Sequence, residues 1–255
     1  METDAIPGAN AAQQTLNEVT SLVSACTRCT LSASRKKAVP GEGPAAARIM
    51  MIGEGPGFYE NEQGRPFVGA AGQFLDALLE KAGVARADVF ITNVVKCRPP
   101  GNRDPLPDEL LACGEYLDRQ IEAINPLVIV TLGRYSMGKF LPNVKISEVH
   151  GKPVWVRARL VVPMFHPAAA LHQPSLKTSV ERDFARLPEW IAEARSSSHT
   201  LKKQVAESLA PYSPDAMPPQ PIQESLLDMF DPQPQVEETK DQAESKNPPR
   251  QLSLF

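Results

Sequence analysis

The sequence feature that most constrains the fold is a continuous apolar run at residues 127–132, LVIVTL. A strand with one face in water alternates apolar and polar residues, whereas an uninterrupted run marks a strand buried on both faces. Burial on both faces requires helices above and below the sheet. The run therefore predicts an α/β protein with a mainly parallel sheet.

Other apolar runs and helical patterns alternate along the chain on both sides of this strand. Further strands are predicted at residues 48–52, 89–92, 154–156 and 160–163, and helices at residues 12–25, 74–83, 107–124 and 176–194. This alternation predicts a doubly wound, three-layer α/β/α sandwich. In such sheets ligands bind where loops leave the carboxyl ends of the strands.

The composition changes near residue 195. From there Pro, Ser, Gln, Glu and Lys dominate, aromatic residues are scarce and no apolar period is sustained. Such a segment cannot bury enough apolar surface to offset its ordering entropy. We therefore expect residues 1–194 to form one folded domain and residues 195–255 a disordered tail. The tail carries the net charge of −3, so the neutral domain does not coat nucleic acid by bulk charge.

No stretch approaches the roughly 20 apolar residues that a membrane span requires. The N-terminal sequence METDAIPGAN also lacks the basic and apolar regions of a signal peptide. We expect a cytoplasmic protein without membrane contact. In that reducing compartment, cysteines serve as metal ligands or buried thiols rather than as a disulfide framework.

The sequence contains four cysteines, namely Cys26, Cys29, Cys97 and Cys113. The first two form a C-x2-C pair, which favours a metal centre over four unlinked buried thiols. Four thiolates suit either zinc or an iron–sulfur cluster, and their spacing alone does not separate the two. The other two cysteines flank a Pro-rich loop, so a centre would direct the loop residues Lys96, Arg98 and Arg103 toward phosphates.

Three polar or glycine-rich segments follow predicted strands. They are residues 53–57 (GEGPG), Asn93 and His166. Pro167 restricts His166 to an extended conformation that can point its ring beyond the strand end, a context that the other three histidines lack. We expect the three segments to converge on one crevice.

The glycine-rich turn invites comparison with a dinucleotide-binding motif. The last glycine of G-x-G-x-x-G would fall at Phe58, and Pro56 removes an N–H that a phosphate would need. Close backbone approach to a small planar ligand fits the turn equally well.

Four motifs in order along the chain resemble those of the family 4 uracil-DNA glycosylases. They are GEGPGFYENEQGRPFVGAAG at 53–72, ITNVVKCRPPGNRDP at 91–105, the four cysteines, and HPAAAL at 166–171. The resemblance covers residues 20–192. It implies an enzyme that flips uracil out of DNA and hydrolyses its N-glycosidic bond, which leaves an abasic site and initiates base excision repair. It also implies a [4Fe-4S] cluster, rather than zinc, on Cys26, Cys29, Cys97 and Cys113.

The resemblance further implies roles for single residues. Phe67 stacks on the uracil ring, and Asn93 offers one donor and one acceptor that match uracil O4 and N3–H but not cytosine. His166 donates a hydrogen bond to uracil O2 as negative charge develops there. Glu54 positions or activates the water, and Gly55 lets the backbone approach the base.

Two assignments stay open at this stage. Glu60 completes the pattern G-E-x-P-G-x-x-E, so it is an alternative to Glu54 for the water, or it lies against uracil C5 and excludes the methyl group of thymine. Leu171, in the loop after His166, is a candidate wedge for the space that the flipped base leaves, with core packing as its alternative.

Two other functions compete with this interpretation. A non-catalytic, metal-containing DNA-binding or damage-sensing module would lack Glu54, Asn93 or His166, and all three are present. A relative that becomes covalently trapped on the abasic product carries an extra His-containing loop after the asparagine strand, and VVKCRPPGNRDP contains no His.

The last five residues, QLSLF, resemble the Q-L-[SD]-L-F peptide that docks on the bacterial sliding clamp. Gln251 would hydrogen-bond at the rim of the clamp pocket while Leu252, Leu254 and Phe255 bury apolar surface. Residues 223–230 loosely resemble the other clamp-binding pattern and are either a weaker second site or a chance match. We expect a monomer that binds uracil-containing DNA with its domain and the clamp with its tail.

Overall fold

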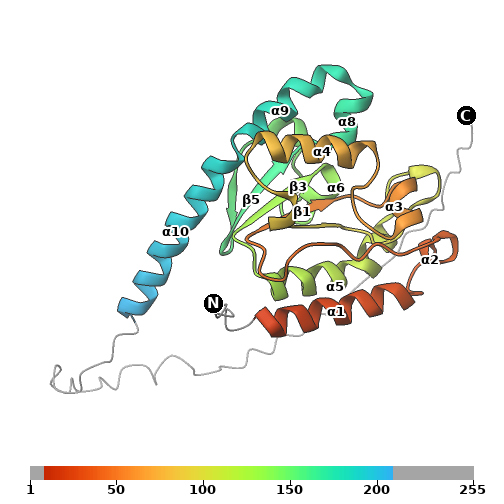
Figure 1. Ribbon diagram of the computed structural model, residues 1–255, viewed down its shortest axis with the longest axis horizontal. Coiled ribbons are helices and arrows are strands. Elements are labelled where there is room, and N and C mark those ends of the chain that lie inside the picture. Colours follow the sequence, from red (N-terminus) through yellow and green to blue (C-terminus); the bar gives the residue numbers. More distant parts are fainter. Residues whose placement is uncertain (1–8, 209–255) are drawn as a thin grey trace, which may run out of the picture. The chain divides into compact units, whose positions relative to one another are not determined.

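The computed structural model describes residues 9–208, with side chains from residue 10 to residue 197, and places one sheet between two layers of helices (Figure 1). The strands are β1 (Ile49–Gly53), β2 (Val89–Asn93), β3 (Val128–Leu132), β4 (Val154–Val156) and β5 (Arg159–Met164). Their order is β2-β1-β3-β5-β4, and all neighbours are parallel except β4 and β5. The predicted α/β/α sandwich is confirmed.

Helices cover both faces of the sheet (Figure 1). One face carries α4 (Ala70–Lys81), α8 (Pro167–His172), α9 (Lys177–Ala185) and α10 (Leu187–Ser208), and the other carries α1 (Ala9–Ala25) and α5 (Pro107–Ile124). Shorter helices are α2 (Leu31–Ser34), α3 (Phe58–Gln63), α6 (Arg134–Gly138) and α7 (Ile146–Val149). Single 3-10 turns lie at Arg86–Asp88, Pro100–Asn102 and Pro174–Leu176.

Strand β3 is buried on both faces, as its apolar run predicted. Val128, Val130 and Leu132 belong to the core beneath α4 and α9, whereas Ile129 belongs to the core beneath α1 and α5. All four side chains are fully buried. The strand therefore supplies alternate residues to two separate cores, which requires a helical layer on each side.

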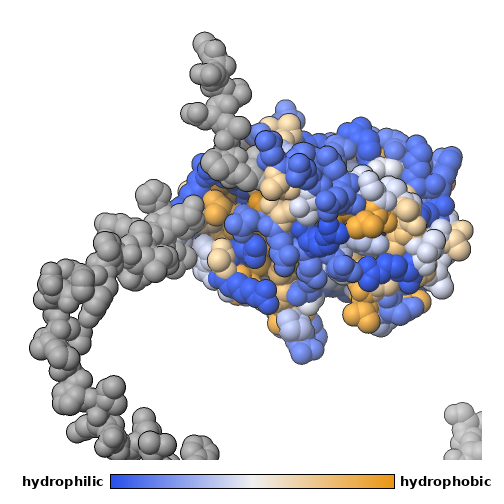
Figure 2. All heavy atoms as spheres, turned by 90° about the horizontal axis from the view of Figure 1, so that it is seen from below, coloured by the Kyte–Doolittle hydropathy of each residue, from blue (hydrophilic) through white to orange (hydrophobic). Residues whose placement is uncertain are grey.

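Helix α1 lies against α5 on the outer side of the second core. Leu16, Val19 and Val23, at helical spacing, are buried, while most of the other side chains on α1 are exposed. The molecular face seen from below Figure 1 is accordingly hydrophilic for the most part, with small apolar patches (Figure 2). None of the helices within residues 9–208 is long and apolar enough to span a bilayer.

The end of the domain differs from the sequence prediction. Instead of one helix at 176–194, the chain forms α9 and α10 with a break at Arg186, because Pro188 fits only the first turn of a new helix. Helix α10 also continues past residue 194 to Ser208. Residues 195–208 contain neither Pro nor Gly, so nothing in them interrupts a helix that has already started.

Parallel pairing brings the carboxyl ends of the strands to one edge of the sheet. Gly53 pairs with Asn93 across β1 and β2, and Leu132 pairs with Met164 across β3 and β5. The segments that leave these strand ends therefore start side by side.

Candidate active site

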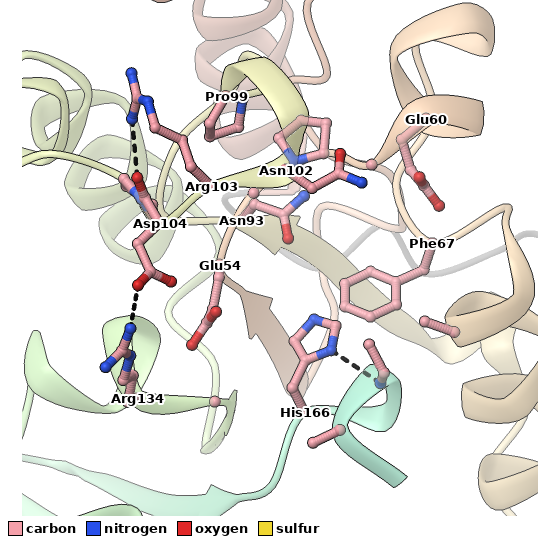
Figure 3. A pocket seen from close by; sticks show the side chains of 18 of the residues that line it. Glu54, Glu60, Phe67, Asn93, Pro99, Asn102, Arg103, Asp104, Arg134 and His166 are labelled. Atoms are coloured by element: carbon pink, nitrogen blue, oxygen red, sulfur yellow. Dashed lines mark hydrogen bonds and ion pairs between the residues drawn. The ribbon is translucent and has the colours of Figure 1, made fainter. Parts of the chain in front are cut away.

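A cavity of about 480 Å³ opens where these segments leave the sheet (Figure 3). Its size is within the range of small-molecule sites. Its lining includes the six residues that the sequence predicted for a pocket: Glu54, Gly55, Glu60, Phe67, Asn93 and His166. The expected convergence of three strand ends on one crevice is therefore confirmed.

Asn93 ends β2 with its side chain at the cavity. The residue is 1% exposed, and its Oδ1 atom has no hydrogen-bond partner among the residues that the structure describes. A buried amide oxygen without a partner costs about 1–3 kcal/mol. The site therefore presents a hydrogen-bond acceptor that a ligand donor would satisfy.

The ring of Phe67 lies beside this amide (Figure 3). At Gly53, an added Cβ would lie 2.4 Å from Asn93 Oδ1 and 2.8 Å from the Phe67 ring. The rings of Phe67 and His166 are stacked, with centroids 5.5 Å apart and 24° between their planes. A flat apolar face, an imidazole and an amide thus line the same space.

Phe67 adopts a backbone conformation that is rare for a residue with a side chain, with φ at 52°. Two charged side chains hold the loop around it. The Glu60 carboxylate accepts hydrogen bonds from the N–H groups of Val68 and Gly69, at 2.8 and 2.9 Å. The Arg86 guanidinium donates to the carbonyl oxygens of Pro66 and Phe67, at 2.8 and 3.3 Å. The position of the ring is therefore fixed from both sides of the chain.

His166 connects β5 to α8 in the extended conformation that Pro167 imposes, with φ −65° and ψ 134°. The Ala168 N–H donates to Nδ1 of the ring at 3.1 Å, so the neutral ring carries its proton on Nε2. Burial lowers the pKa of His166 to about 4, although the nearby Glu60 acts in the opposite direction. At neutral pH, His166 is therefore an uncharged hydrogen-bond donor.

Glu54 follows β1 and is half-buried beside the cavity. Burial raises the pKa of its carboxyl group, and a hydrogen bond from the Tyr135 N–H at 3.2 Å and the charge of Arg134 oppose that rise. At Gly133, with φ at 98°, a Cβ would lie 2.4 Å from Glu54 Oε1. Glu54 therefore occupies space that only a glycine at position 133 leaves open.

The segment that follows His166 corrects one prediction. Residues 167–172 form helix α8 rather than a loop, because Pro167 suits the first helical position and three alanines follow it. Leu171 lies on this helix and is 48% exposed; the next residue, His172, lines the cavity. Its exposure excludes the core-packing alternative, and the wedge role stays a prediction.

The residues of the site differ in how far the sequence signals them. Gly53 and Gly133 each follow a predicted strand, and Gly53 lies in the predicted turn at 53–57, so their position is a signal for a close contact. Arg86 and Arg134 had none, because their partners lie far away in the chain. Arg134 forms an ion pair with Asp104, and both line the cavity.

The four cysteines line one second, small cavity, together with Lys96 and Tyr116. Three of their sulfurs accept hydrogen bonds: Cys26 from the Arg28 N–H, Cys97 from the Arg35 guanidinium and Cys113 from the Lys96 N–H. Burial raises the pKa of Cys113 to about 11. In the described part of the chain, no three His, Cys, Asp or Glu side chains converge closely enough for a single metal ion. Four thiolates are a donor set that both iron–sulfur clusters and structural zinc ions use, so these residues fit a sulfur-bound metal centre.

Lys96 corrects the expectation that the basic loop residues face phosphates. It is 1% exposed, and its ammonium group donates to Thr92 Oγ1, to the Asn93 carbonyl oxygen and to Gln120 Oε1. An ammonium group has three donors, and all three are used inside the protein. Lys96 is therefore a structural residue.

The predicted clamp-binding residues Gln251, Leu252, Leu254 and Phe255, and the segment 223–230, lie outside the described residues.

We expect Gly72→Ala to reduce both stability and function. A Cβ at this first-turn position of α4 would lie 1.9 Å from the Phe67 carbonyl oxygen, so the Phe67 loop would have to shift. Overpacking of this kind costs about 1–3 kcal/mol. Gly114→Ala is the matched control, because it is also helical and nothing lies within 4 Å of its added Cβ. Thermal melting of both variants checks the prediction, and equal midpoints would contradict it.

The low pKa of His166 should make stability depend on pH. The unfolded chain binds a proton at His166 below about pH 6.5, whereas the folded chain does so only near 4. Folding is therefore favoured above that window and loses about 2 kcal/mol from this group at pH 5. His166→Gln removes this titrating group. When the pH is lowered from 7.5 to 5, the melting temperature of the unchanged protein should therefore fall by roughly 4–8 °C more than that of the variant. A pH-independent difference would contradict the assignment.

Comparison with known proteins agrees with this geometry. Residues 40–187 match the uracil DNA glycosylase superfamily. A type-4 uracil-DNA glycosylase of Saccharolobus solfataricus is 50% identical over 174 residues, which cover 64% of this chain and 81% of the relative. Another type-4 uracil-DNA glycosylase, from Thermotoga maritima, is 44% identical over 184 residues, or 70% of this chain and 96% of the relative.

The likeness to a neighbouring group is weaker. A type-5 uracil-DNA glycosylase of Thermus thermophilus is 36% identical over 120 residues, which cover 41% of this chain and 54% of the relative. The matching region includes the whole cavity lining. The chain belongs to the uracil DNA glycosylase superfamily, and within it to the type-4 uracil-DNA glycosylases.

Proposed function

We propose that this protein removes uracil from DNA by hydrolysing the N-glycosidic bond of a flipped-out deoxyuridine. The observation that carries the proposal is the unpartnered Oδ1 of Asn93, buried beside the rings of Phe67 and His166. A base inside a duplex cannot reach this cavity, so the nucleotide must rotate out of the stack.

Recognition of uracil follows from the amide and the ring. Asn93 Oδ1 accepts from uracil N3–H, and its NH₂ group donates to O4; cytosine presents the opposite pattern at these two positions. Phe67 supplies a flat apolar surface for the pyrimidine. Because Glu60 and Arg86 fix the loop that carries Phe67, the loop loses little conformational freedom when a base binds.

Cleavage requires stabilisation of the negative charge that develops on the departing uracil. The neutral His166 ring donates from Nε2 to uracil O2, and this bond strengthens as the C1′–N1 bond breaks. Because its pKa is low, His166 acts as a hydrogen-bond donor and does not transfer its proton. Water adds to C1′ of the sugar as the C1′–N1 bond breaks, uracil leaves as its anion, and the proton that the water loses passes to solvent.

The structure favours Glu54 over Glu60 as the residue that handles this water. Both oxygens of a carboxylate can accept, but Glu60 Oε1 is already engaged by two backbone N–H groups. Glu54 Oε1 accepts from the Tyr135 N–H at the longer distance of 3.2 Å, and the Arg134 N–H also interacts with this carboxylate. We assign Glu54 to orient the water and offset the positive charge on the sugar, and Glu60 to hold the Phe67 loop.

The direct test uses a labelled oligonucleotide that contains one uracil, followed by alkali to cleave abasic sites. We expect strand cleavage at uracil and none at thymine. Asn93→Asp should shift preference toward cytosine, because a carboxylate accepts from an exocyclic amine. DNA that stays intact with the unchanged protein refutes the proposed activity. An unaltered preference for uracil in Asn93→Asp refutes only the role of Asn93 in base recognition.

We further propose that Cys26, Cys29, Cys97 and Cys113 hold a [4Fe-4S] cluster. Support comes from four sulfurs around one cavity and from the N–H donors that point at three of them, since such bonds tune iron–sulfur centres. When bound, the cluster supplies a cross-link among the segment that follows α1, the Pro-rich loop and α5. None of the four cysteines lines the large cavity, so the role is structural.

Protein purified without oxygen should be brown and contain about four irons per chain. Cys97→Ala should lose iron and melt at a lower temperature, because the ligands and the fold stabilise each other. Iron analysis and absorption spectra check this. One zinc per chain and no colour would instead establish a single-ion centre.

The C-terminal QLSLF sequence supports a second partner, the bacterial sliding clamp. A short peptide with one polar and three apolar anchors suits a preformed groove, with affinity in the micromolar range. Tethering would raise the local concentration of the enzyme where uracil is incorporated during synthesis.

Deletion of residues 251–255 should abolish clamp binding and leave cleavage of a short free oligonucleotide unchanged. Fluorescence anisotropy with purified clamp measures the first, and the alkali assay the second. A variant with alanines at Leu226 and Leu227 is the control for the upstream segment and should retain binding. Clamp affinity that survives the deletion would exclude QLSLF as the docking site.

A further inference from the structure

Several exposed apolar side chains are close neighbours in sequence of the residues that line the large cavity. Among the side chains that the structure describes, nine large hydrophobic ones are exposed, and five of these lie within two residues of the lining: Phe58, Tyr59, Leu106, Val144 and Leu171. Phe58 and Tyr59 are aromatic and 52% and 58% exposed. Apolar surface gathered beside a pocket marks a binding surface.

The two aromatic rings are held in place by their neighbours. Phe58 and Tyr59 begin α3 directly after Gly57, and their rings meet edge to face with centroids 5.4 Å apart. Tyr59 also packs on the backbone at Gly69, where an added Cβ would lie 3.3 Å from its ring. Gly69 belongs to the loop that Glu60 fixes. The rings therefore form a preordered surface.

Arg98 adds a positive charge to this surface. Its guanidinium carbon lies 5.3 Å from the centroid of the Phe58 ring, and its Nε donates to Asn102 Oδ1 at 2.8 Å. Asn102 lines the cavity on the side opposite His166 (Figure 3). Within residues 10–197, no acidic side chain pairs with Arg98. Its charge thus remains available to an anion.

We propose that Phe58, Tyr59 and Arg98 form a stacking platform for the nucleobase next to the flipped uracil in single-stranded DNA. The inference rests on the proposed function, because the cavity fixes where the strand runs. Aromatic rings stack on any base, and a guanidinium group binds the phosphate that links two nucleotides. Exposed aromatic rings beside a cation match that composition.

The platform requires an unpaired neighbour. In a duplex, the bases next to the extruded uracil remain paired and stacked, so their faces are covered. In a single strand, the neighbouring base is free to leave its own stack and lie on a protein ring. The surface therefore favours uracil in single strands.

The test pairs a protein change with a DNA change. Phe58→Ala combined with Tyr59→Ala should raise KM for a single-stranded uracil oligonucleotide about tenfold, with the single-turnover rate at saturation within twofold. An oligonucleotide with baseless tetrahydrofuran residues on both sides of the uracil should show a similar loss with the unchanged protein. The double variant should then show no further loss on this baseless substrate.

Three comparisons complete the experiment. Phe58→Trp should retain the KM of the unchanged protein, because the ring is kept. Trp155→Ala removes another exposed aromatic, on β4 away from the cavity, and should leave KM unchanged. In a U:A duplex the double variant should change KM less than twofold.

Several results would overturn the platform. The first is an unchanged KM of the double variant on the single-stranded substrate. The second is a KM of the double variant on the baseless substrate that is raised by the product of the two separate increases. The third is an equal increase in KM on the U:A duplex. Each of these results counts against the platform when the unchanged protein cleaves the single-stranded substrate. Absence of cleavage by the unchanged protein would instead overturn the proposed function, so the two failures are distinguishable.

Discussion

The site depends on one steric constraint, which is that the backbone at Gly53 passes beside the Asn93 amide and the Phe67 ring without a side chain between them. Parallel pairing sets Gly53 opposite Asn93, and a Cβ at position 53 would overlap both groups. The same constraint recurs at Gly133, where a Cβ would overlap the Glu54 carboxylate. The sheet register brings the functional groups together, and two absent side chains give them room.

The Phe67 loop shows how a strained backbone is kept in place. A non-glycine residue in the left-handed region costs about 1–3 kcal/mol. Against this, the loop makes four hydrogen bonds to charged groups, two from its N–H groups to Glu60 and two from Arg86 to its carbonyl oxygens. Bonds to charged groups contribute about 1.5–3 kcal/mol each, so together they exceed the strain. The aromatic surface of the pocket is therefore fixed before any ligand binds.

The sequence could predict what is local and could not predict what depends on distant partners. Strand β3 and Asn93 were predictable, because an apolar run and a polar residue at its exit are read along the chain. Lys96 was not, since its burial depends on Gln120, which lies 24 residues away on α5. Arg86 was missed for the same reason, because the carbonyl of Phe67 lies 19 residues before it. Helix α10 extends beyond its predicted end at residue 194 because residues 195–208 contain neither Pro nor Gly to stop it.

The large cavity and the cysteine cavity are linked by one short segment, from Asn93 to Cys97. Burial lowers the pKa of Lys96 to about 7, and three oxygen acceptors, one of them the Asn93 carbonyl, compensate for the buried ammonium group. The backbone N–H of the same lysine donates to the Cys113 sulfur. Because Cys97 is the next residue, the cysteines fix the backbone on which the Asn93 amide stands. They can therefore affect base recognition through position alone, although none of them lines the cavity where the base would bind.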